Sequence, residues 1–346
     1  DDIAAQLDDL KGQIVSGAIT VPTVPGDVAI VNPLGSPENP IQVLFVPSTS
    51  AEEIIAGGAL LADELNSATG LTFEVSVPTS YAATVEAMCA APESTIGFIP
   101  AQAYVLASQL CGVDVELKSI RYGYDVYWTQ FLVARDSDFA TFEDLDGATW
   151  AYPDAGSTSG FLFPTGMFIS AGIEPGESFE GGGHPGAARA VYNNEADFAT
   201  TFYSPPTDAD RNALWDGDPA NADIPDDLVD ECAINDDGEI QCGEYIVQDA
   251  RRNLREELPD IVQKVRILTL SPDIPNDLMT YSPDFPADIR ELVTAAIVAY
   301  AENDPDGFEA AFDAYSWSSV APATDSEVDP VRVILDAVGY NLEDLG

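Results

Sequence analysis

The stretch PDAGSTSGFLFP, residues 153–164, places three hydroxyl side chains and two glycines directly before an apolar run. Ser and Thr are favoured N-cap residues, because their side-chain oxygens accept hydrogen bonds from unpaired amides of the first helical turn. The same turn attracts anions, since its N–H groups point outward and the helix dipole is positive there. Ser157, Thr158 and Ser159 therefore form either an ordinary helix cap or a cradle for an anion.

Strands and helices alternate on both sides of this stretch. IQVLFVP at 41–47 and TWAYP at 149–153 are apolar strands, and each runs into a hydroxyl-rich turn followed by a helix. Such alternation is typical of βαβ units with parallel strands, so we expect an α/β protein. In open α/β sheets, ligands lie beyond the carboxyl ends of the strands. The turns at 47–50 and 157–160 would then face one cleft from opposite lobes, which favours the anion cradle.

The predicted elements fall into two α/β lobes preceded by an N-terminal piece. Residues 1–20 have the apolar spacing of an amphipathic helix, and a proline-rich arm follows it. We expect the chain to cross between the lobes near residues 123–127 and 268–280, where hinge bending would close the cleft. The predicted divisions are the helix and arm at 1–40, lobe 1 at 41–123 plus about 275–346, and lobe 2 at 124–274 with an insertion near 230–245.

The charge of the chain is strongly negative. Sixty acidic residues against 13 basic ones give a net charge of -47 over 346 residues. A nucleic acid or an anionic membrane would be repelled by that field, so we expect no nucleic-acid partner. The acidic residues are spread along the chain, which indicates a solvated surface. Any anion that the protein captures must therefore be held by local donors against the field of the whole molecule.

Four cysteines fall into two local pairs, Cys89 with Cys111 and Cys232 with Cys242. The second pair flanks NDDG, a strong hairpin turn that would bring the two cysteines opposite each other. We interpret the pairs as two disulfides, the alternative being four buried thiols. Disulfides indicate an oxidising compartment, and no run of 18 apolar residues suggests a membrane span. We therefore expect a periplasmic or extracellular, cell-surface-associated protein whose signal peptide has been removed.

Several motifs occur in an order that resembles a known family. They are FVPSTS, PTSYAATVEAM, YWTQFLVARDSDFATFEDLDG, DAGSTSGFLFP, GGH before an alanine-rich helix, ADFAT and SPDIPND. From about residue 41 to about residue 330 the chain resembles the periplasmic phosphonate/phosphite/phosphate-binding proteins of ABC importers. The resemblance implies a two-lobed periplasmic-binding-protein-like fold with a hinge and a ligand cleft between the lobes.

The resemblance also implies a set of ligand-binding residues. In the family, the hydroxyls and amides of the STSG-type turn hold phosphoryl oxygens at a helix N-terminus. Hydroxyl and amide donors are directional, which suits a tetrahedral oxyanion. The positions implied here are Ser157, Thr158 and Ser159 in that turn, Tyr81, Tyr127, His184 and Asp277 around the cleft, and Ser48, Thr49 and Ser50 as a cap from the other lobe.

Each of these residues also has a simpler interpretation. His184 could be a packing residue, Tyr81 and Tyr127 half-buried aromatics, and Asp277 a turn aspartate. The chain also departs from the family, because TTFYSPP carries Ser204 near the place where some members have a carboxylate for the amine of the ligand. A smaller oxyanion without an amine is therefore expected.

The predicted function is a solute receptor that takes a small phosphorus oxyanion to an ABC permease and needs no cofactor. An enzyme is not expected, because the chain has no P-loop, GxSxG or HExxH motif and no nucleophile paired with a base. The alternative is a surface or filament-forming structural protein that reuses the receptor fold and self-associates through the N-terminal arm.

Overall fold

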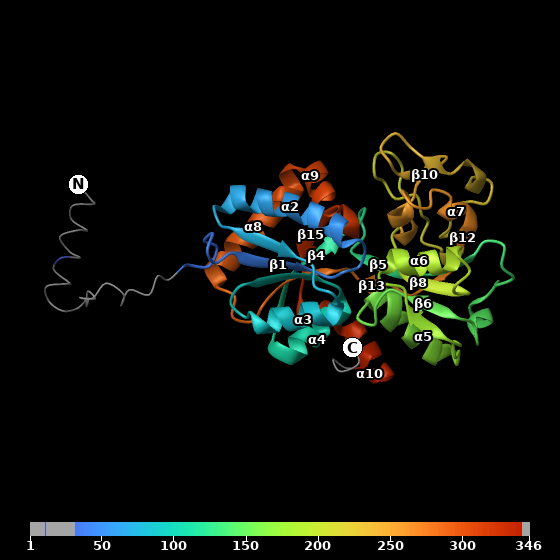
Figure 1. The fold of residues 1–346 in the computed structure, drawn as a ribbon, viewed down its shortest axis with the longest axis horizontal. Helices are drawn as coiled ribbons and strands as arrows, with labels where there is room; N and C mark the ends of the chain where they lie inside the picture. The colour runs from blue at the N-terminus through green and yellow to red at the C-terminus, as the bar shows by residue number, and fades with distance from the viewer. Residues whose placement is uncertain (1–10, 12–31, 341–346) are drawn as a thin grey trace.

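The computed structural model describes Lys11 and residues 32–340, and residues 32–340 form two lobes side by side (Figure 1). The helix expected over residues 1–20 and most of the proline-rich arm lie outside the described residues, Lys11 excepted. Self-association through that arm therefore stays a prediction. The described end of the arm turns at Ser36–Asn39 and leads directly into the first strand.

Lobe 1 is built on a six-stranded sheet with the order β15-β4-β14-β3-β1-β2. Its strands are β1 (Ile41–Phe45), β2 (Phe73–Ser76), β3 (Thr95–Ile99), β4 (Asp114–Ile120), β14 (Leu278–Tyr281) and β15 (Ser319–Pro322). Its helices are α2 (Ala51–Thr69), α3 (Tyr81–Ala90), α4 (Ala101–Cys111), α8 (Ala287–Asn303) and α9 (Pro305–Ala311). In Figure 1, α2 lies above the sheet and α3 and α4 lie below it, so both faces are covered.

Lobe 2 is built on a second sheet with the order β12-β5-β8-β6-β7, to which β13 adds by pairing with β5. Its strands are β5 (Val126–Ala134), β6 (Trp150–Tyr152), β7 (Ser178–Glu180), β8 (Phe198–Tyr203), β12 (Val265–Leu270) and β13 (Ile274–Pro275). Its helices are α5 (Phe163–Ala171), α6 (His184–Tyr192) and α7 (Ile261–Lys264), and α10 (Asp329–Val338) contacts both α4 of lobe 1 and α5 of lobe 2.

Each sheet contains a strand that runs against the parallel arrangement that the alternating pattern predicts, and in lobe 1 β15 also does so, because it is antiparallel to β4. β14 is antiparallel to both β3 and β4, and β5 is antiparallel to both β8 and β12. Each is the first strand after a crossing between the lobes. A strand that arrives from the other lobe enters its sheet from the cleft side, so it runs opposite to strands that end there. The two sheets are therefore mixed, although the α/β class is as predicted.

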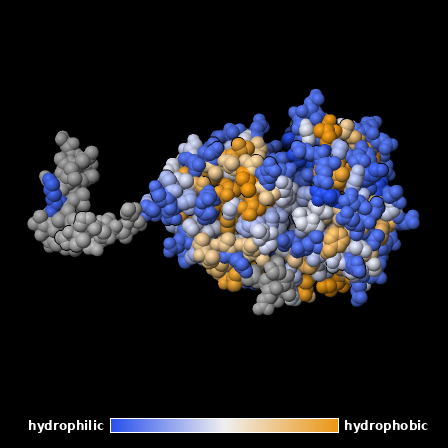
Figure 2. All heavy atoms as spheres, in the orientation of Figure 1, coloured by the Kyte–Doolittle hydropathy of each residue, from blue (hydrophilic) through white to orange (hydrophobic). Residues whose placement is uncertain are grey.

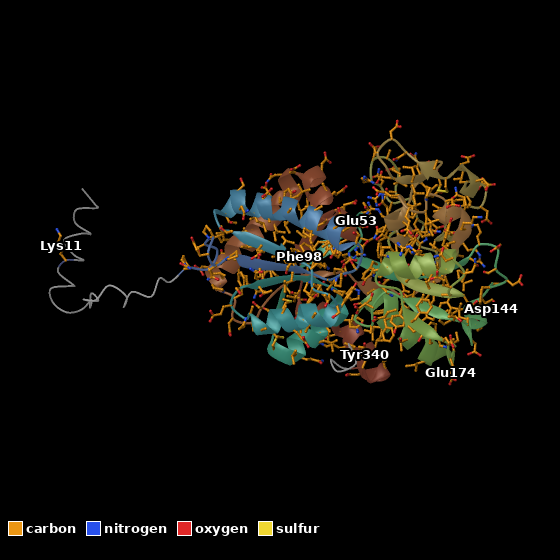
Figure 3. The ribbon with its side chains drawn as sticks, in the orientation of Figure 1. Lys11, Glu53, Phe98, Asp144, Glu174 and Tyr340 are labelled. Carbon is orange, nitrogen blue, oxygen red and sulfur yellow. A yellow bond between two sulfur atoms is a disulfide. The ribbon has the colours of Figure 1, made fainter. Side chains whose placement is uncertain are left out.

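The core of lobe 1 contains a cluster of aromatic rings. Phe98, labelled in Figure 3, stacks on Phe45 with ring centroids 4.8 Å apart and meets Trp317 edge-on at 5.5 Å. Such pairs contribute beyond their buried area. The labelled Asp144 and Glu174 lie at the outer edge of lobe 2 (Figure 3), in keeping with the mainly hydrophilic surface in Figure 2. Along the part of the chain that is described, no helix has the length and apolar character needed to span a membrane.

Both predicted disulfides are present. Cys89 joins Cys111 at the ends of α3 and α4, and Cys232 joins Cys242. The second pair flanks a hairpin of β9 (Ala233–Ile234) and β10 (Ile240–Cys242), in which Gln241 lies opposite Ala233. This register brings the cysteines together, as the NDDG turn predicts.

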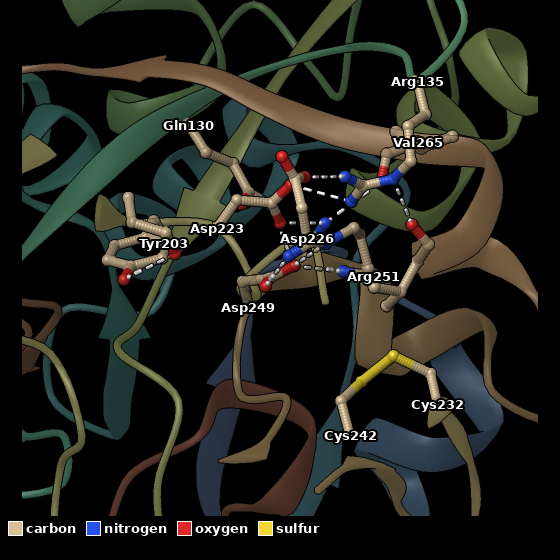
Figure 4. Close-up of polar contacts among 12 residues, drawn as sticks. Gln130, Arg135, Tyr203, Asp223, Asp226, Cys232, Cys242, Asp249, Arg251 and Val265 are labelled. Carbon is tan, nitrogen blue, oxygen red and sulfur yellow. Dashed lines mark hydrogen bonds and ion pairs between the residues drawn. A yellow bond between two sulfur atoms is a disulfide. The ribbon is translucent and has the colours of Figure 1, made fainter. Parts of the chain in front are cut away.

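A buried ion-pair network anchors the insertion that carries this hairpin (Figure 4). The Arg251 guanidinium is almost fully buried and lies 2.9 Å from the Asp249 carboxylate and 2.8 Å from that of Asp223. A charge can be buried at tolerable cost only when it is paired and hydrogen-bonded in this way. β11 (Tyr245–Ile246) completes the small sheet of the insertion.

Candidate functional site

A small cavity of about 20 Å³ lies between the lobes. Lobe 1 and its crossing segments, and lobe 2, both contribute to its wall. The lining residues are Val46, Ser48, Tyr81, Pro100, Arg121, Tyr127, Ser157, Ser159, His184, Phe202, Asp277, Ala314 and Tyr315. The space suits a small polar ligand and not an extended one.

The hydroxyl-rich turn of lobe 2 is both a cap and part of the cavity wall. The Ser157 hydroxyl accepts a hydrogen bond from the Gly160 amide at 3.0 Å, as a helix cap does. Residues Thr158–Leu162 form a π-helical turn that continues into α5. The Ser157 and Ser159 side chains line the cavity, and each hydroxyl can donate one hydrogen bond as well as accept. The two interpretations of this stretch are therefore compatible.

Thr158 does not line the cavity. Its hydroxyl accepts from the Gln102 backbone amide of α4 at 2.9 Å, and the Gln102 side chain donates to the Ala155 carbonyl at 3.2 Å. The middle residue of the turn thus connects lobe 2 to the start of a helix of lobe 1. This contact holds the lobes together beside the cavity.

The hydroxyl loop of lobe 1 contributes one of its three residues to the cavity. Ser48 lines it, and the Ser48 carbonyl accepts from the His184 amide of lobe 2 at 2.9 Å. The Thr49 hydroxyl lies 3.3 Å from Glu53 and accepts from Asn253 of lobe 2 at 3.2 Å. Ser50 is exposed and begins α2 without a side-chain cap. The structure therefore places Thr49 and Ser50 beside the cavity and not in its wall.

His184 begins α6 and presents a donor to the cavity. Its Nδ1 accepts from the Phe202 backbone amide at 3.2 Å, so Nδ1 carries no proton. Burial and the nearby Arg121 charge lower the pKa of His184 to about 3, which makes the ring neutral at physiological pH. A neutral imidazole with an unprotonated Nδ1 carries its proton on Nε2. His184 can therefore donate from Nε2 to a ligand.

Three tyrosines complete the wall of the cavity. Tyr81, at the first turn of α3, and Tyr127, at the start of β5, are almost fully buried, and burial raises the pKa of both phenols. They therefore remain neutral donors. Tyr315 donates to the Val46 carbonyl at 2.7 Å. Its role was not predicted from the sequence.

The structure adds Arg121, which sequence reasoning missed, next to the predicted Asp277. The two side chains form a buried ion pair through Nη2 of Arg121. The guanidinium carbon lies 4.4 Å from the centre of the Tyr127 ring. Within the described residues, Nε and Nη1 of Arg121 are buried without a hydrogen-bond partner. The sequence gives one signal for Arg121, because a basic residue is rare in this chain and this one lies at the end of a strand, just before the first crossing.

The cavity therefore gathers hydrogen-bond donors around a small space. Its donors come from serine and tyrosine hydroxyls, the Nε2–H of His184 and the guanidinium of Arg121, and its one carboxylate, Asp277, is already paired. Burying unpaired donors is costly, so such a site favours a ligand rich in acceptor oxygens. Among the described residues, no group of His, Cys, Asp and Glu is arranged to hold a metal ion.

Comparison with known proteins finds a matching family, a curated relative and similar solved structures. The sequence model of a family described as the periplasmic substrate-binding protein of phosphonate ABC transporters matches residues 43–328. The Phosphate-import protein PhnD of Mycolicibacterium smegmatis is 28% identical over 199 residues, which are 53% of this chain and 60% of that relative. The chain thus spans less than two thirds of the length of this curated relative.

Two solved structures share the fold. A binding-protein component of an ABC phosphonate transporter from Pseudomonas aeruginosa superposes with a TM-score of 0.65 at 15% identity, over 89% of this chain and 87% of that one. PhnD1 from Prochlorococcus marinus, in complex with methylphosphonate, gives a TM-score of 0.65 at 12% identity, over 86% of this chain and 98% of that one. The two-lobed fold expected from the sequence is confirmed.

Proposed function

Because the chain belongs to the periplasmic substrate-binding proteins of phosphonate ABC transporters, we propose that it captures a small phosphorus oxyanion outside the cytoplasm and delivers it to a permease. The ligand is a phosphonate, phosphite or phosphate, bound in the cavity between the lobes. The permease recognises the closed, loaded form.

One observation carries this proposal: hydrogen-bond donors from both lobes converge on one small cavity. Ser157 and Ser159 approach from lobe 2, and Ser48 approaches from lobe 1. A tetrahedral oxyanion presents acceptor oxygens in several directions, so donors from both sides are satisfied together only when the lobes close on it. Ligand binding and lobe closure are thereby the same event.

The cavity is equipped for binding and not for catalysis. The Nδ1 atom of His184 is occupied by the Phe202 amide, and its lowered pKa makes the ring a weak base. A general base needs a pKa near the working pH and a proton to remove within reach. His184 therefore acts as a fixed donor.

The proposal is tested by calorimetric titration of the ligand-stripped protein with phosphite, phosphate and methylphosphonate. Ser159→Ala removes a cavity hydroxyl that caps no amide, whereas Ser50→Ala removes one from the exposed loop and serves as the matched control. A hydrogen bond to a charged ligand contributes about 1.5–3 kcal/mol, so Ser159→Ala should weaken binding roughly tenfold to a hundredfold.

The expected result is one-to-one binding of at least one of the three anions, weakened by Ser159→Ala and unchanged by Ser50→Ala. Equal affinities of the two variants would show that the ligand does not bind in the cavity. Absence of heat and of a thermal shift with all three anions would contradict the proposed ligand class itself.

A further inference from the structure

Asp277 is the single carboxylate among the described residues that line the cavity. It matters because many natural phosphonates carry an ammonium group on the carbon arm. Such a ligand is a zwitterion, and its ammonium would enter the cavity together with the phosphonate. A buried ammonium without an anionic partner is strongly disfavoured. In this cavity the partner would have to be Asp277.

Arg121 already occupies that carboxylate. Its Nη2 pairs with an Asp277 oxygen, and both side chains are buried. The guanidinium also lies over two aromatic rings, 4.4 Å from the centre of Tyr127 and 5.7 Å from that of Phe202. Cation–π contacts of this kind strengthen when the cation is desolvated. The guanidinium is therefore held by the Asp277 carboxylate and by two aromatic rings.

The backbone fixes both partners as well. The Arg121 amide donates to the Tyr124 carbonyl at 2.9 Å, within the first crossing. The Asp277 carbonyl accepts from the Ser119 amide at 2.9 Å, so the second crossing is hydrogen-bonded to the end of β4, directly before the first crossing. The ion pair joins the two segments around which the lobes would bend. An ammonium that approached Asp277 would lie beside the Arg121 guanidinium, a cation that this framework holds in place, and would be repelled by it.

The unpaired edge of the guanidinium has a different role. Nε and Nη1 are buried and lack a partner among the described residues. A charged donor left unpaired is costly, and an oxyanion in the cavity would supply the missing acceptor. One side chain thus blocks the carboxylate and offers donors to the anion.

We propose that Arg121 is a built-in counterion that occupies Asp277 and restricts the ligand to small phosphorus oxyanions without an ammonium group. This inference rests on the proposed function and adds the determinant of ligand class. It also predicts that Asp277 pairs with the ammonium group of a ligand once the guanidinium is removed. The site would then change its specificity instead of simply losing affinity.

The first arm of the test uses the unaltered protein. Methylphosphonate, 2-aminoethylphosphonate and propylphosphonate are titrated separately, because the last two have nearly the same shape and differ in the terminal charge. The expected preference for methylphosphonate over 2-aminoethylphosphonate is roughly a hundredfold or more, as for a buried charge without a partner. Tighter binding of 2-aminoethylphosphonate than of methylphosphonate would overturn the inference while leaving the proposed function intact.

The second arm uses Arg121→Met, which removes the positive charge and the guanidinium nitrogens beside Asp277. This variant should gain at least about tenfold in affinity for 2-aminoethylphosphonate and prefer it to propylphosphonate. Arg121→Lys keeps a cation beside Asp277 and should show no such gain. In Arg121→Met/Asp277→Asn the gain should disappear, because the carboxylate that receives the ammonium is gone.

A properly folded Arg121→Met that binds methylphosphonate but not 2-aminoethylphosphonate overturns the inference. A gain that persists in the double variant also overturns it. If Arg121→Met does not fold, the unaltered protein and Arg121→Lys still decide, since tighter binding of 2-aminoethylphosphonate than of methylphosphonate by either one would contradict the inference. Failure of the unaltered protein to bind any phosphonate, phosphite or phosphate would instead refute the proposed function on which the inference rests.

Discussion

At the scale of single residues, His184 shows how burial decides chemistry. The side chain is enclosed at the cavity wall and accepts a hydrogen bond at Nδ1 from the Phe202 amide. Protonation would place a second positive charge near Arg121 in a poorly solvated site. The ring is therefore a constant donor over the range in which an ordinary histidine titrates.

The lowered pKa of His184 predicts a specific pH dependence of stability. The pKa is about 3 in the folded chain and 6.5 for an ordinary histidine, so between these values the unfolded chain binds one more proton. The contribution is fully present above pH 6.5 and is lost as the pH falls toward 3, by about 1.4 kcal/mol per pH unit. His184→Gln cannot titrate there. Its free energy of unfolding, measured by denaturant between pH 7 and 4, should therefore fall less steeply than that of the unaltered protein. The difference in slope should be about 1.4 kcal/mol per pH unit.

The carboxylates titrate in both the unaltered protein and His184→Gln, so the difference between their two pH curves reports on His184 alone. Parallel curves for the two proteins would show that His184 is solvated or charged in the folded state. The interpretation of His184 as a permanently neutral hydrogen-bond donor would then be wrong.

At the scale of elements, the turn before α5 depends on a glycine. Gly160 receives the Ser157 cap bond, and a Cβ built on it would lie 2.1 Å from Cγ of Pro153. The Gly160 carbonyl accepts from the Thr200 hydroxyl, which fixes the turn against β8. No side chain can be added here without moving the turn away from the proline.

We expect Gly160→Ala to weaken both the fold and ligand binding. Overpacking of a rigid contact costs about 1–3 kcal/mol of stability, and the shifted turn would misplace the Ser157 and Ser159 hydroxyls. Gly172→Asn at the other end of α5 is the matched control, because nothing lies within 4 Å of its added Cβ and asparagine tolerates its φ of +69°. Thermal melts and oxyanion titrations of both variants test this. Normal affinity in Gly160→Ala would mean that the turn does not position the ligand.

The sequence predicts elements best where the pattern is local. The strand expected at 41–47 is β1, Ile41–Phe45, and the strand expected at 149–153 is β6, Trp150–Tyr152. The π-helical start of α5 was not predicted, because it follows from the contacts of Gly160 with Pro153 and Thr200. Arg121 was missed for a related reason. Its partner Asp277 lies 156 residues away, and no local spacing connects them.

At the scale of the whole molecule, a second set of contacts holds the lobes together outside the cavity. Arg252 of lobe 2 pairs with the Asp313 carboxylate of lobe 1 and donates to the Asp313 carbonyl at 2.9 Å. Burial alone would raise the pKa of Asp313, but the Arg252 guanidinium outweighs this and lowers it. These contacts favour the closed arrangement independently of any ligand.

Loosening this contact should weaken ligand binding from a distance. Asp313→Asn removes the negative charge opposite Arg252 and leaves a buried guanidinium without its ionic partner, which disfavours the closed form. We expect oxyanion affinity to fall roughly tenfold, mainly through faster dissociation, as measured by stopped-flow competition. The matched control is Glu257→Gln, which breaks an exposed pair with Arg189 inside lobe 2. Equal affinities for both variants would show that the pair does not contribute to closure.

The most direct measurement of the central claim is a crystal structure of the protein with bound methylphosphonate. The account predicts phosphonate oxygens within hydrogen-bond distance of the hydroxyls of Ser157 and Ser159, Nε2 of His184, and Nε or Nη1 of Arg121, with the Arg121–Asp277 pair intact. A ligand found instead in the open groove lined by Arg211, Arg252 and Arg255 would contradict it, as would a ligand that displaces Arg121 from Asp277.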